Sequence, residues 1–205
     1  MKRSATEESL EADNHTDGCV KGSLGYARDD NWKNMFKKIL LIIASEGFRQ
    51  EEYFETKKVL ESVGFVVVTA SDAMGKAVAK DGSLASVDLL VGDVNVADYD
   101  GIFFVGGPGA LAHLDNEKSY QIANLSVNKP HGAICISPRI LAHAGILKNK
   151  KVTGWDKDEE LAGILDSVGA EYVKKSVVVD GNLITANGPE AAKEFGEAIV
   201  KLLKT

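Results

Sequence analysis

The sequence contains little cysteine, no long apolar run and no excess of basic residues. Only two of its 205 residues are cysteine, too few for a disulfide framework and in keeping with a reducing cytoplasm. The longest apolar run, residues 39–44, falls far short of the roughly 20 residues that a membrane-spanning helix needs. Lys and Arg number 24 against 30 Asp and Glu, a formal net charge of −6. We therefore expect a cytoplasmic protein that binds neither nucleic acid nor a membrane, since both partners require a basic face.

Motifs for metal and nucleotide binding are absent or incomplete. No group of His, Cys and Asp stands at metal-ligand spacing, and H-E-x-x-H is missing. Residues 107–112 match the G-x-G-x-x-A dinucleotide fingerprint. However, this match does not follow the first strand, and residues 127–137 lack the acidic residue that would hold a ribose. The sequence therefore predicts neither a metal nor another cofactor.

Residues 1–34 differ in composition from the rest of the chain. They are polar and show neither the helical nor the strand period of apolar residues, so we expect a disordered N-terminal tail. Nothing before residue 35 resembles the apolar segment of a signal peptide. Met35 could be the natural start, and no role is expected for Cys19. Residues 35–205 are long enough for one domain with its own core.

Apolar strand-like segments alternate with helical ones across this domain. The patterns predict strands at 39–44, 65–70, 102–105, 131–134 and 151–153, helices at 50–63, 117–127, 138–144, 158–168 and 190–203, and hairpins at 76–90 and 177–184. Alternation of this kind is typical of βαβ units, a parallel sheet and a doubly wound α/β sandwich. Ligands of such folds bind at the carboxyl ends of the strands.

A nucleophile elbow is predicted at Cys135. Small residues stand two positions before and two after it, at Ala133 and Ser137, and Pro138 opens a helix. A sharp strand-to-helix turn requires this spacing, because larger side chains would clash there. The helix N-terminus would favour a thiolate. The alternative is a buried structural cysteine, which is the commoner role of a single cysteine.

Glu52 is the candidate acid for this thiol. It lies in the first turn of the first predicted helix and shares an apolar face with Thr56, Leu60 and Val63. Burial there would raise its pKa, so that a protonated carboxyl could donate to sulfur or carry a proton. Alternatively, Glu52 is a solvated residue that only favours the helix dipole.

Backbone donors are expected beside the sulfur. Gly106 and Gly107 follow a buried strand, so a ligand could approach their backbone closely. The N–H groups of Gly107 and Ile136 could form an oxyanion hole. The alternative is a tight turn with no ligand. Loop 45–48 ends the first strand at the same sheet edge.

The histidines are poorly placed to serve as a base. His131 begins the cysteine strand, four residues before Cys135, so we expect it to lie toward the opposite edge of the sheet. His143 lies near the end of the following helix, where a solvated or capping role is expected. His113 follows the glycine loop and could approach the pocket, although packing or a subunit contact is the alternative.

These residues resemble the ThiJ/PfpI superfamily over roughly residues 38–204. The resemblance rests on Lys38-Ile-Leu-Leu-Ile-Ile-Ala44, Glu51-Glu52, Val105-Gly106-Gly107, Ala133-Ile-Cys-Ile-Ser-Pro138, Leu141-Ala-His-Ala-Gly145, Val152-Thr153 and Ile184-Thr-Ala-Asn-Gly-Pro189. It implies a flavodoxin-like three-layer α/β/α sandwich with a mostly parallel sheet, assembled as a homodimer or larger homo-oligomer. It also implies that Cys135 is the reactive thiol, that Glu52 contacts it, and that Gly107 and Ile136 supply backbone donors.

The chain departs from this family pattern at two places. Protease-like members carry His directly after the cysteine, where this chain has Ile136, so a peptidase would lack its base. Other members carry His after the strand that corresponds to residues 152–153, where this chain has Trp155. Trp155 could cap the pocket, and Asp156 could orient a substrate. Arg49 and Arg139 could attract an anionic substrate or face water.

Three functions follow from the resemblance and these departures. The first is an enzyme of glyoxalase or deglycase type, in which Cys135 attacks a small carbonyl compound and Glu52 moves the proton. The second is a non-catalytic stress protein that senses oxidation at Cys135. The third, a peptidase or amidase, is disfavoured by Ile136. The fold does not choose among them.

Overall fold

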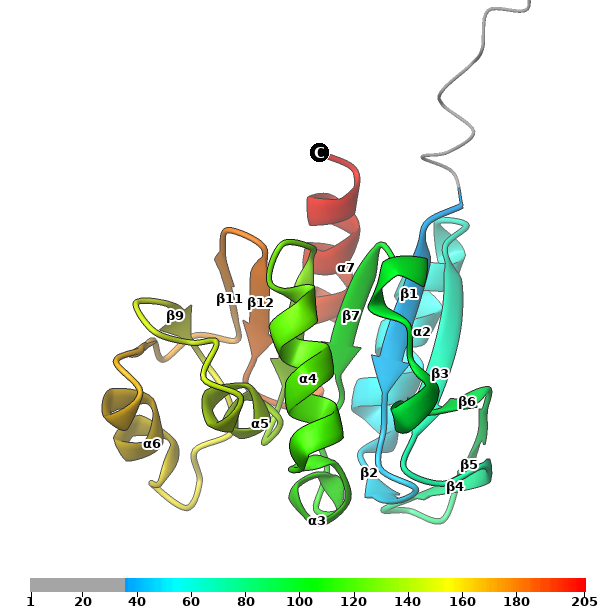
Figure 1. Ribbon diagram of the computed structural model, residues 1–205, viewed down its shortest axis with the longest axis horizontal. Helices are drawn as coiled ribbons and strands as arrows, with labels where there is room; N and C mark the ends of the chain where they lie inside the picture. The colour runs from blue at the N-terminus through cyan, green and yellow to red at the C-terminus, as the bar shows by residue number, and fades with distance from the viewer. Residues whose placement is uncertain (1–35) are drawn as a thin grey trace, which may run out of the picture.

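A seven-stranded sheet forms the centre of the computed structural model, which describes residues 36–205 (Figure 1). In spatial order its strands are β11 (Val177–Asp180), β12 (Leu183–Ala186), β8 (His131–Ile134), β7 (Gly101–Phe104), β1 (Lys38–Ile42), β3 (Val66–Ser71) and β6 (Leu89–Leu90). All neighbours run parallel except β11, which pairs antiparallel with β12. The predicted α/β fold with a mostly parallel sheet is confirmed. The expected tail and Cys19 lie outside the described residues.

Two layers of helices cover this sheet. On one face lie α2 (Gln50–Ser62) and α7 (Ala192–Leu203), and on the other lie α4 (Glu117–Ser126), α5 (Pro138–His143) and α6 (Leu161–Ser167). Strand β1 explains why both faces are covered. Ile39 and Leu41 pack into the α2–α7 core, whereas Leu40 and Ile42 pack into the other. Because successive side chains alternate between faces, a strand buried on both sides is continuously apolar.

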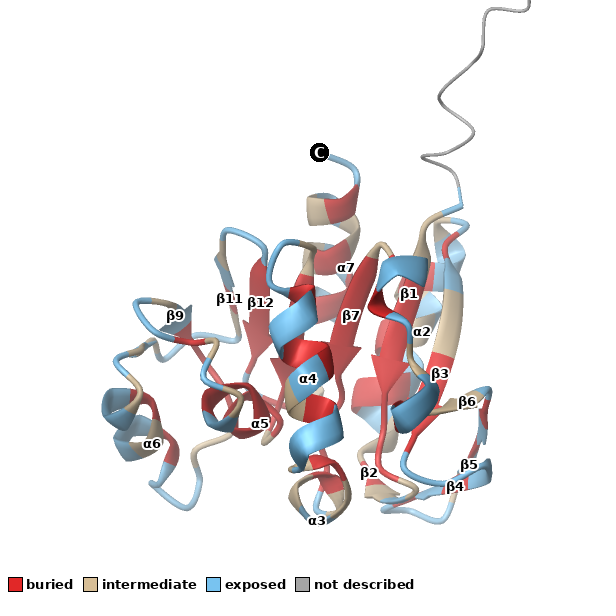
Figure 2. Ribbon diagram, viewed as in Figure 1, coloured by how far each residue is buried: buried red, intermediate tan, exposed pale blue. Residues whose placement is uncertain are grey.

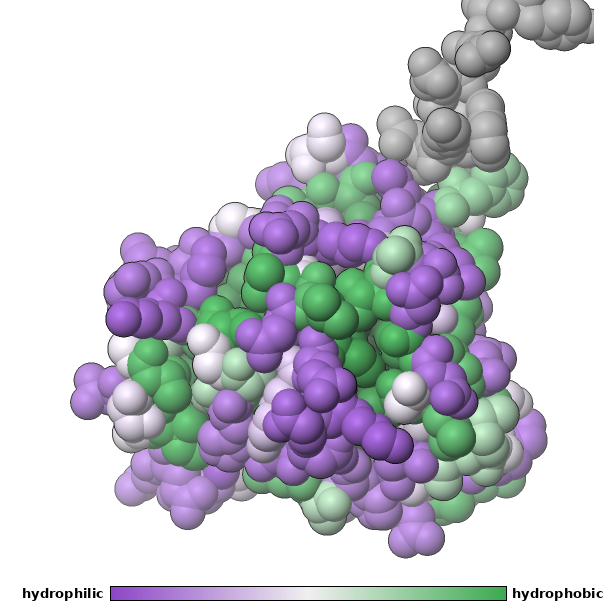
Figure 3. Space-filling view, viewed as in Figure 1, coloured by the Kyte–Doolittle hydropathy of each residue, from purple (hydrophilic) through white to green (hydrophobic). Residues whose placement is uncertain are grey.

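Burial follows this layered arrangement. The central strands β1, β7, β8 and β12 are buried along most of their length, and helices α2, α4 and α7 bury only one side (Figure 2). Hydrophilic side chains cover much of the α4 face and interrupt its apolar patches (Figure 3), as expected for helices that face water. Within residues 36–205, no helix is both long and apolar enough to cross a membrane.

Several short elements were not anticipated. Strand β2 (Glu46–Phe48) lies where a loop was expected, and it pairs with β4 (Gly75–Ala79) of a hairpin in a separate sheet. The hairpin was predicted over residues 76–90, but its second strand β5 (Leu84–Val87) ends earlier, and Leu89–Leu90 join the central sheet as β6. Strand β9 (Lys151–Val152) pairs with an unpredicted β10 (Glu171–Tyr172). Helix α3 (Ala110–Leu114) and the 3₁₀ turns η1 (Val91–Asp93), η2 (Val96–Asp98) and η3 (Pro189–Ala191) were also unforeseen. Elements this short carry too little periodicity to be predicted.

Helix α6 begins later than the sequence predicted. The expected start was residue 158, but the helix runs from Leu161 to Ser167. The Asp156 carboxylate accepts the Leu161 N–H at 2.8 Å and so satisfies one of the free donors at the helix start. The intervening residues are instead held in a turn by contacts with Arg139.

Candidate active site

The carboxyl ends of β1, β7 and β8 bring three loops together at one sheet edge (Figure 1). The first loop leads into α2 and Glu52, the second carries Gly106 and Gly107, and the third carries Cys135. The loops are joined by backbone hydrogen bonds, since Arg49 N–H donates to the Gly106 carbonyl at 2.9 Å. Parallel pairing of the strands therefore creates this convergence, as the sequence led us to expect.

Cys135 occupies a strained elbow. Its φ of +65° lies in the left-handed region, which costs a non-glycine residue about 1–3 kcal/mol. Hydrogen bonds on both sides hold this conformation: Cys135 N–H donates to the Ala186 carbonyl at 2.9 Å, and Trp155 N–H donates to the Cys135 carbonyl at 2.7 Å. Ser137, which is fully buried, donates to the Val105 carbonyl at 2.9 Å. The elbow is thus fixed by neighbouring strands and loops.

Gly106 leaves the space in which the thiol and Glu52 meet. A Cβ atom at this position would lie 2.5 Å from Cβ of Cys135 and 2.8 Å from Oε2 of Glu52. The missing side chain also lets Gly106 N–H donate to Oε2 of Glu52 at 3.0 Å. Gly106 therefore lies against Cβ of Cys135 and orients the acid.

Glu52 is completely buried, on the helical face that also buries Thr56 and Leu60. Its Oε1 atom has no nitrogen or oxygen partner, and the carboxyl group interacts with the Cys135 thiol. Burial raises the pKa of Glu52 to about 7, although the thiol, the Gly106 N–H and the positive charge of Arg49 partly oppose this rise. Glu52 is thus poised to gain or lose a proton near neutral pH.

The pKa of the Cys135 thiol is raised, whereas the sequence suggested that it would be lowered. Burial and the Glu52 carboxylate raise its pKa, and the N–H groups of Ile136 and Gly107 lower it by a smaller amount. The expected stabilisation of the thiolate by the helix N-terminus is therefore wrong as the dominant effect. Helix α5 has only six residues, and a neighbouring carboxylate opposes a second negative charge. A thiolate is favoured only when Glu52 is protonated, since the acid then becomes a donor.

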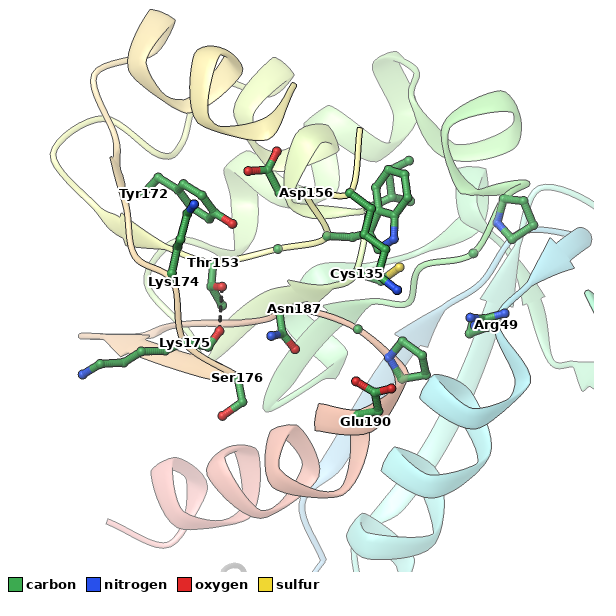
Figure 4. Close-up of a pocket in the computed structure, with 18 of the residues that line it drawn as sticks. Arg49, Cys135, Thr153, Asp156, Tyr172, Lys174, Lys175, Ser176, Asn187 and Glu190 are labelled. Carbon is green, nitrogen blue, oxygen red and sulfur yellow. Dashed lines mark hydrogen bonds between the residues drawn. The ribbon is translucent and has the colours of Figure 1, made fainter. Parts of the chain in front are cut away.

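An open cavity of about 660 Å³ exposes the sulfur (Figure 4). Arg49, Gly107, Ile136 and Trp155 line it together with Cys135. The structure adds Tyr172, Lys174, Lys175 and Glu190, which the sequence did not single out, and also Thr153 and Asn187, which were noted only within the family resemblance. These residues lie in or after β9, β10 and β12. The order of strands in the sheet brings them to this cavity.

The expectation that His113 borders this pocket is wrong. His113 lines a separate hollow of about 330 Å³, where its Nδ1 lies 2.8 Å from Oδ2 of Asp72. His143 Nδ1 lies 2.9 Å from Oδ2 of Asp115. His131, at the start of β8, contacts the Lys129 carbonyl through Nδ1 at 2.8 Å. Among residues 36–205, no histidine borders the cavity above Cys135.

Arg139 is neither solvated nor free for a substrate. Its side chain is only 4% exposed, and its guanidinium pairs with Asp158 at 2.6 Å and with Glu160 at 2.9 Å. Its Cζ atom lies 5.7 Å from the centre of the Trp155 ring, within the range of a cation–π contact. Arg139 therefore holds the loop that carries Trp155 and Asp156 against the start of α5.

The fold and this site define an α/β sandwich protein with a nucleophile elbow and a buried cysteine–glutamate pair. Residues 37–202 match the model of the DJ-1/PfpI family, and the chain belongs to this family. An uncharacterized protein of Methanocaldococcus jannaschii is 40% identical over 178 residues, covering 85% of each chain. A putative cysteine protease of Bacillus subtilis is 31% identical over 173 residues, covering 83% of this chain and all of that one.

Solved structures of the same family are also similar. A ThiJ/PfpI domain protein from Brachyspira murdochii superposes with a TM-score of 0.76 at 34% identity, covering 81% of this chain and 95% of the other. DJ-1beta from Drosophila melanogaster superposes with a TM-score of 0.73 at 26% identity, covering 83% and 92% respectively.

Proposed function

We propose that the protein is a cysteine-dependent enzyme of glyoxalase or deglycase type that acts on small reactive carbonyl compounds or their adducts. The observation that carries this proposal is the buried pair of Cys135 and Glu52, which lies under the N–H groups of Gly107 and Ile136 at an open cavity. A nucleophile, a proton carrier and an oxyanion site are the groups that such chemistry requires.

Addition is the first step. With methylglyoxal as substrate, the Cys135 thiolate attacks the aldehyde carbon, and the electron pair of the C=O bond moves to oxygen. The N–H groups of Gly107 and Ile136 stabilise this oxyanion. Protonated Glu52 then donates its proton to the oxygen, which gives a hemithioacetal and leaves Glu52 as a carboxylate.

Proton transfer and hydrolysis complete the reaction. The Glu52 carboxylate removes the proton from the former aldehyde carbon and passes it to the neighbouring carbonyl oxygen, which gives an enediol. Glu52 then takes the hydroxyl proton from the sulfur-bearing carbon, whose C=O bond re-forms, and a proton is delivered to the neighbouring carbon. The product is a thioester of lactic acid on Cys135. Water adds to the thioester carbon, the C–S bond breaks, and lactate and the Cys135 thiolate are released together with two protons. One proton returns to Glu52, so the net reaction converts methylglyoxal and water into lactate and one proton. A pKa near 7 suits Glu52 to both directions of transfer.

The proposal is tested by following the loss of methylglyoxal and the appearance of lactate. We expect activity in the wild type, in Cys19→Ser as the matched cysteine control, and none in Cys135→Ser. Glu52→Gln should allow binding but lower the rate by about 10²–10⁴-fold, the range for a lost general acid–base. If Cys135→Ser consumes methylglyoxal as fast as the wild type, the mechanism is wrong.

A second candidate function is redox sensing, which the unpartnered Oε1 of Glu52 favours. Two molecules of hydrogen peroxide would each transfer one oxygen atom to the Cys135 sulfur and leave as water. Protonated Glu52 could then donate to the resulting sulfinate. Mass spectrometry after mild peroxide treatment should find two added oxygens at Cys135, with the methionines unmodified. An unmodified Cys135 would exclude this function.

Peptidase activity has weaker support. One relative is named a putative cysteine protease, but Ile136 follows the cysteine, and no histidine among residues 36–205 lines the cavity. We therefore expect no hydrolysis of casein or of small peptide amides. Cleavage that disappears in Cys135→Ser would reverse this assignment.

A further inference from the structure

The cavity above Cys135 is positively charged although the protein is acidic. Five cationic residues line it, here called the cationic rim: Arg49, Lys80, Lys157, Lys174 and Lys175. Only Asp156 and Glu190 oppose them, so the lining carries a net charge of +3 in a chain of net charge −6. A cleft lined mainly by one sign of charge concentrates ions of the opposite sign.

The lysines of the rim are free to meet a ligand. Among residues 36–205, the lysines that form ion pairs are Lys37, Lys57, Lys150 and Lys193, and none of these belongs to the rim. Arg49 has a single long contact, 3.5 Å to Glu51. Within residues 36–205, no carboxylate forms an ion pair with the four lysines of the rim, whereas Arg49 is partly paired with Glu51.

The backbone that carries Lys174 and Lys175 is held in place from both sides. Thr153 Oγ1 donates to the Lys175 carbonyl at 2.8 Å, and Asn187 N–H donates to the Ser176 carbonyl at 2.9 Å. In Figure 4, these lysines and Arg49 lie on opposite sides of Cys135, and the Lys175 side chain extends away from the sulfur. The rim thus places cations at the border of the cavity from two separate parts of the fold.

The cavity is also larger than a three-carbon dicarbonyl compound requires. Its volume of about 660 Å³ falls in the range of about 300–1,000 Å³ that holds ligands of drug size. We propose that the ligand of this cavity is a carbonyl compound bearing a carboxylate or phosphate group, with its carbonyl carbon at the Cys135 sulfur and its anionic group at the cationic rim. The carbonyl part rests on the proposed function, whereas the anionic part rests on the rim alone.

The anionic part is tested by comparing two alkylating reagents that differ in charge. Both reagents alkylate the cysteine sulfur and release iodide. Iodoacetate is an anion, whereas iodoacetamide is neutral. In a Cys19→Ser background, we expect the ratio of the two rates at Cys135 to exceed the ratio for free cysteine by about 3- to 10-fold. Raising the salt concentration from about 0.02 to about 0.5 M should remove most of this preference.

Charge variants assign the preference to the rim. The double variant Lys174→Gln/Lys175→Gln should lower the iodoacetate preference severalfold. The control Lys148→Gln/Lys201→Gln removes the same charge from exposed residues that do not line the cavity and should leave the preference unchanged. A preference equal to that of free cysteine, or an equal loss in both double variants, would overturn the proposal.

The nature of the anionic group is tested by protection of Cys135 from iodoacetamide. Glyceraldehyde 3-phosphate is compared with glyceraldehyde, and succinic semialdehyde is compared with butanal. We expect one anionic aldehyde to protect at a concentration at least about tenfold below its neutral counterpart, which also separates phosphate from carboxylate recognition. Equal protection within both pairs would overturn the anionic part. A clear iodoacetate preference without any turnover would instead refute the proposed enzyme and leave the anion site standing.

Discussion

At the scale of single residues, Gly106 decides whether the Cys135–Glu52 pair can form. Its backbone N–H holds one oxygen of the acid, and its absent side chain leaves room for Cβ of Cys135. A larger residue does not fit, because its Cβ would meet Cys135, Glu52 and the Ile134 carbonyl. This position therefore couples stability and reactivity more directly than any residue of the cavity wall.

Gly106→Ala should damage both properties. The new Cβ would meet Cβ of Cys135 at 2.5 Å and Oε2 of Glu52 at 2.8 Å, and such overpacking costs about 1–3 kcal/mol of unfolding free energy. The control is Gly163→Ala in α6, where a Cβ has no neighbour within 4 Å and alanine favours the helix. Urea denaturation and iodoacetamide labelling measure the two effects. Unchanged labelling in Gly106→Ala would refute the role assigned to this glycine.

Glu52 should make stability fall as pH rises. Its pKa is about 7 in the folded protein against 4.5 as the ordinary value, so the folded state binds more protons than the unfolded state between these values. Stability is therefore lost progressively over this interval, by up to about 3 kcal/mol. Glu52→Gln, which cannot ionise, should be more stable than the wild type above pH 7 and gain no such advantage below pH 4.5. Urea titrations at several pH values measure the difference, and parallel curves would contradict the assignment.

The same residue should control the reactivity of the thiol. The Glu52 carboxylate raises the pKa of Cys135, so Glu52→Gln should move the midpoint of iodoacetamide alkylation to lower pH. Wild type, Glu52→Gln and the neighbouring Glu51→Gln are compared by following the alkylation rate across pH. The exposed Glu51 serves as the matched control. A midpoint that is indifferent to Glu52 would identify Cys135 as a structural cysteine.

At the scale of elements, the loop between β9 and α6 is attached to the elbow helix α5 through one buried side chain. Arg139 pairs with Asp158 and Glu160 of this loop and lies close to Trp155. The loop also carries Asp156, whose carboxylate accepts the first free N–H of α6. A wall of the cavity thus depends on a buried arginine whose two acidic partners are partly exposed, which makes Arg139 a positioning residue.

Arg139→Met should loosen this wall and leave Cys135 in place. We expect a loss of about 1–3 kcal/mol, less than for a fully buried pair because the acids are partly solvated. In a Trp32→Phe background, fluorescence quenching by acrylamide should increase as Trp155 becomes more accessible. The control Lys57→Met breaks the partly exposed pair with Glu61 and should change stability by less than about 0.5 kcal/mol. Unaltered quenching in Arg139→Met would show that the pair does not hold the loop.

At the scale of the whole molecule, the charges of the cavity and of the surface have opposite signs. A chain of net charge −6 repels anions at long range, whereas the cationic rim attracts them once they are near. Salt should therefore weaken anion binding in the cavity chiefly through the local contacts.

The homodimer or larger assembly implied by the family resemblance stays a prediction. Sedimentation velocity should give at least twice the mass of one chain, and a monomer at all concentrations would contradict it.

Short-range patterns predicted much of this architecture. The continuously apolar segment at residues 39–44 indicated a strand covered on both faces, and β1 is such a strand. The spacing of small residues around Cys135 indicated an elbow, and the residue adopts a left-handed turn after β8. The stripe that includes Glu52 indicated burial, and Glu52 is fully buried. Each of these features depends on neighbours within about one helical turn or one strand, where periodicity is informative.

Only the tertiary structure decided what surrounds the sulfur. Sequence proximity suggested His113 and Arg139 as residues near the site, but His113 faces Asp72 in another hollow, and Arg139 is buried in ion pairs. The lysines of the rim come from loops distant in sequence, which the strand order of the sheet brings together. The pKa direction of Cys135 likewise follows from burial and from a carboxylate on a different helix. Periodicity reports the environment of each segment along the chain, whereas burial and through-space charge depend on segments that only the folded sheet places side by side.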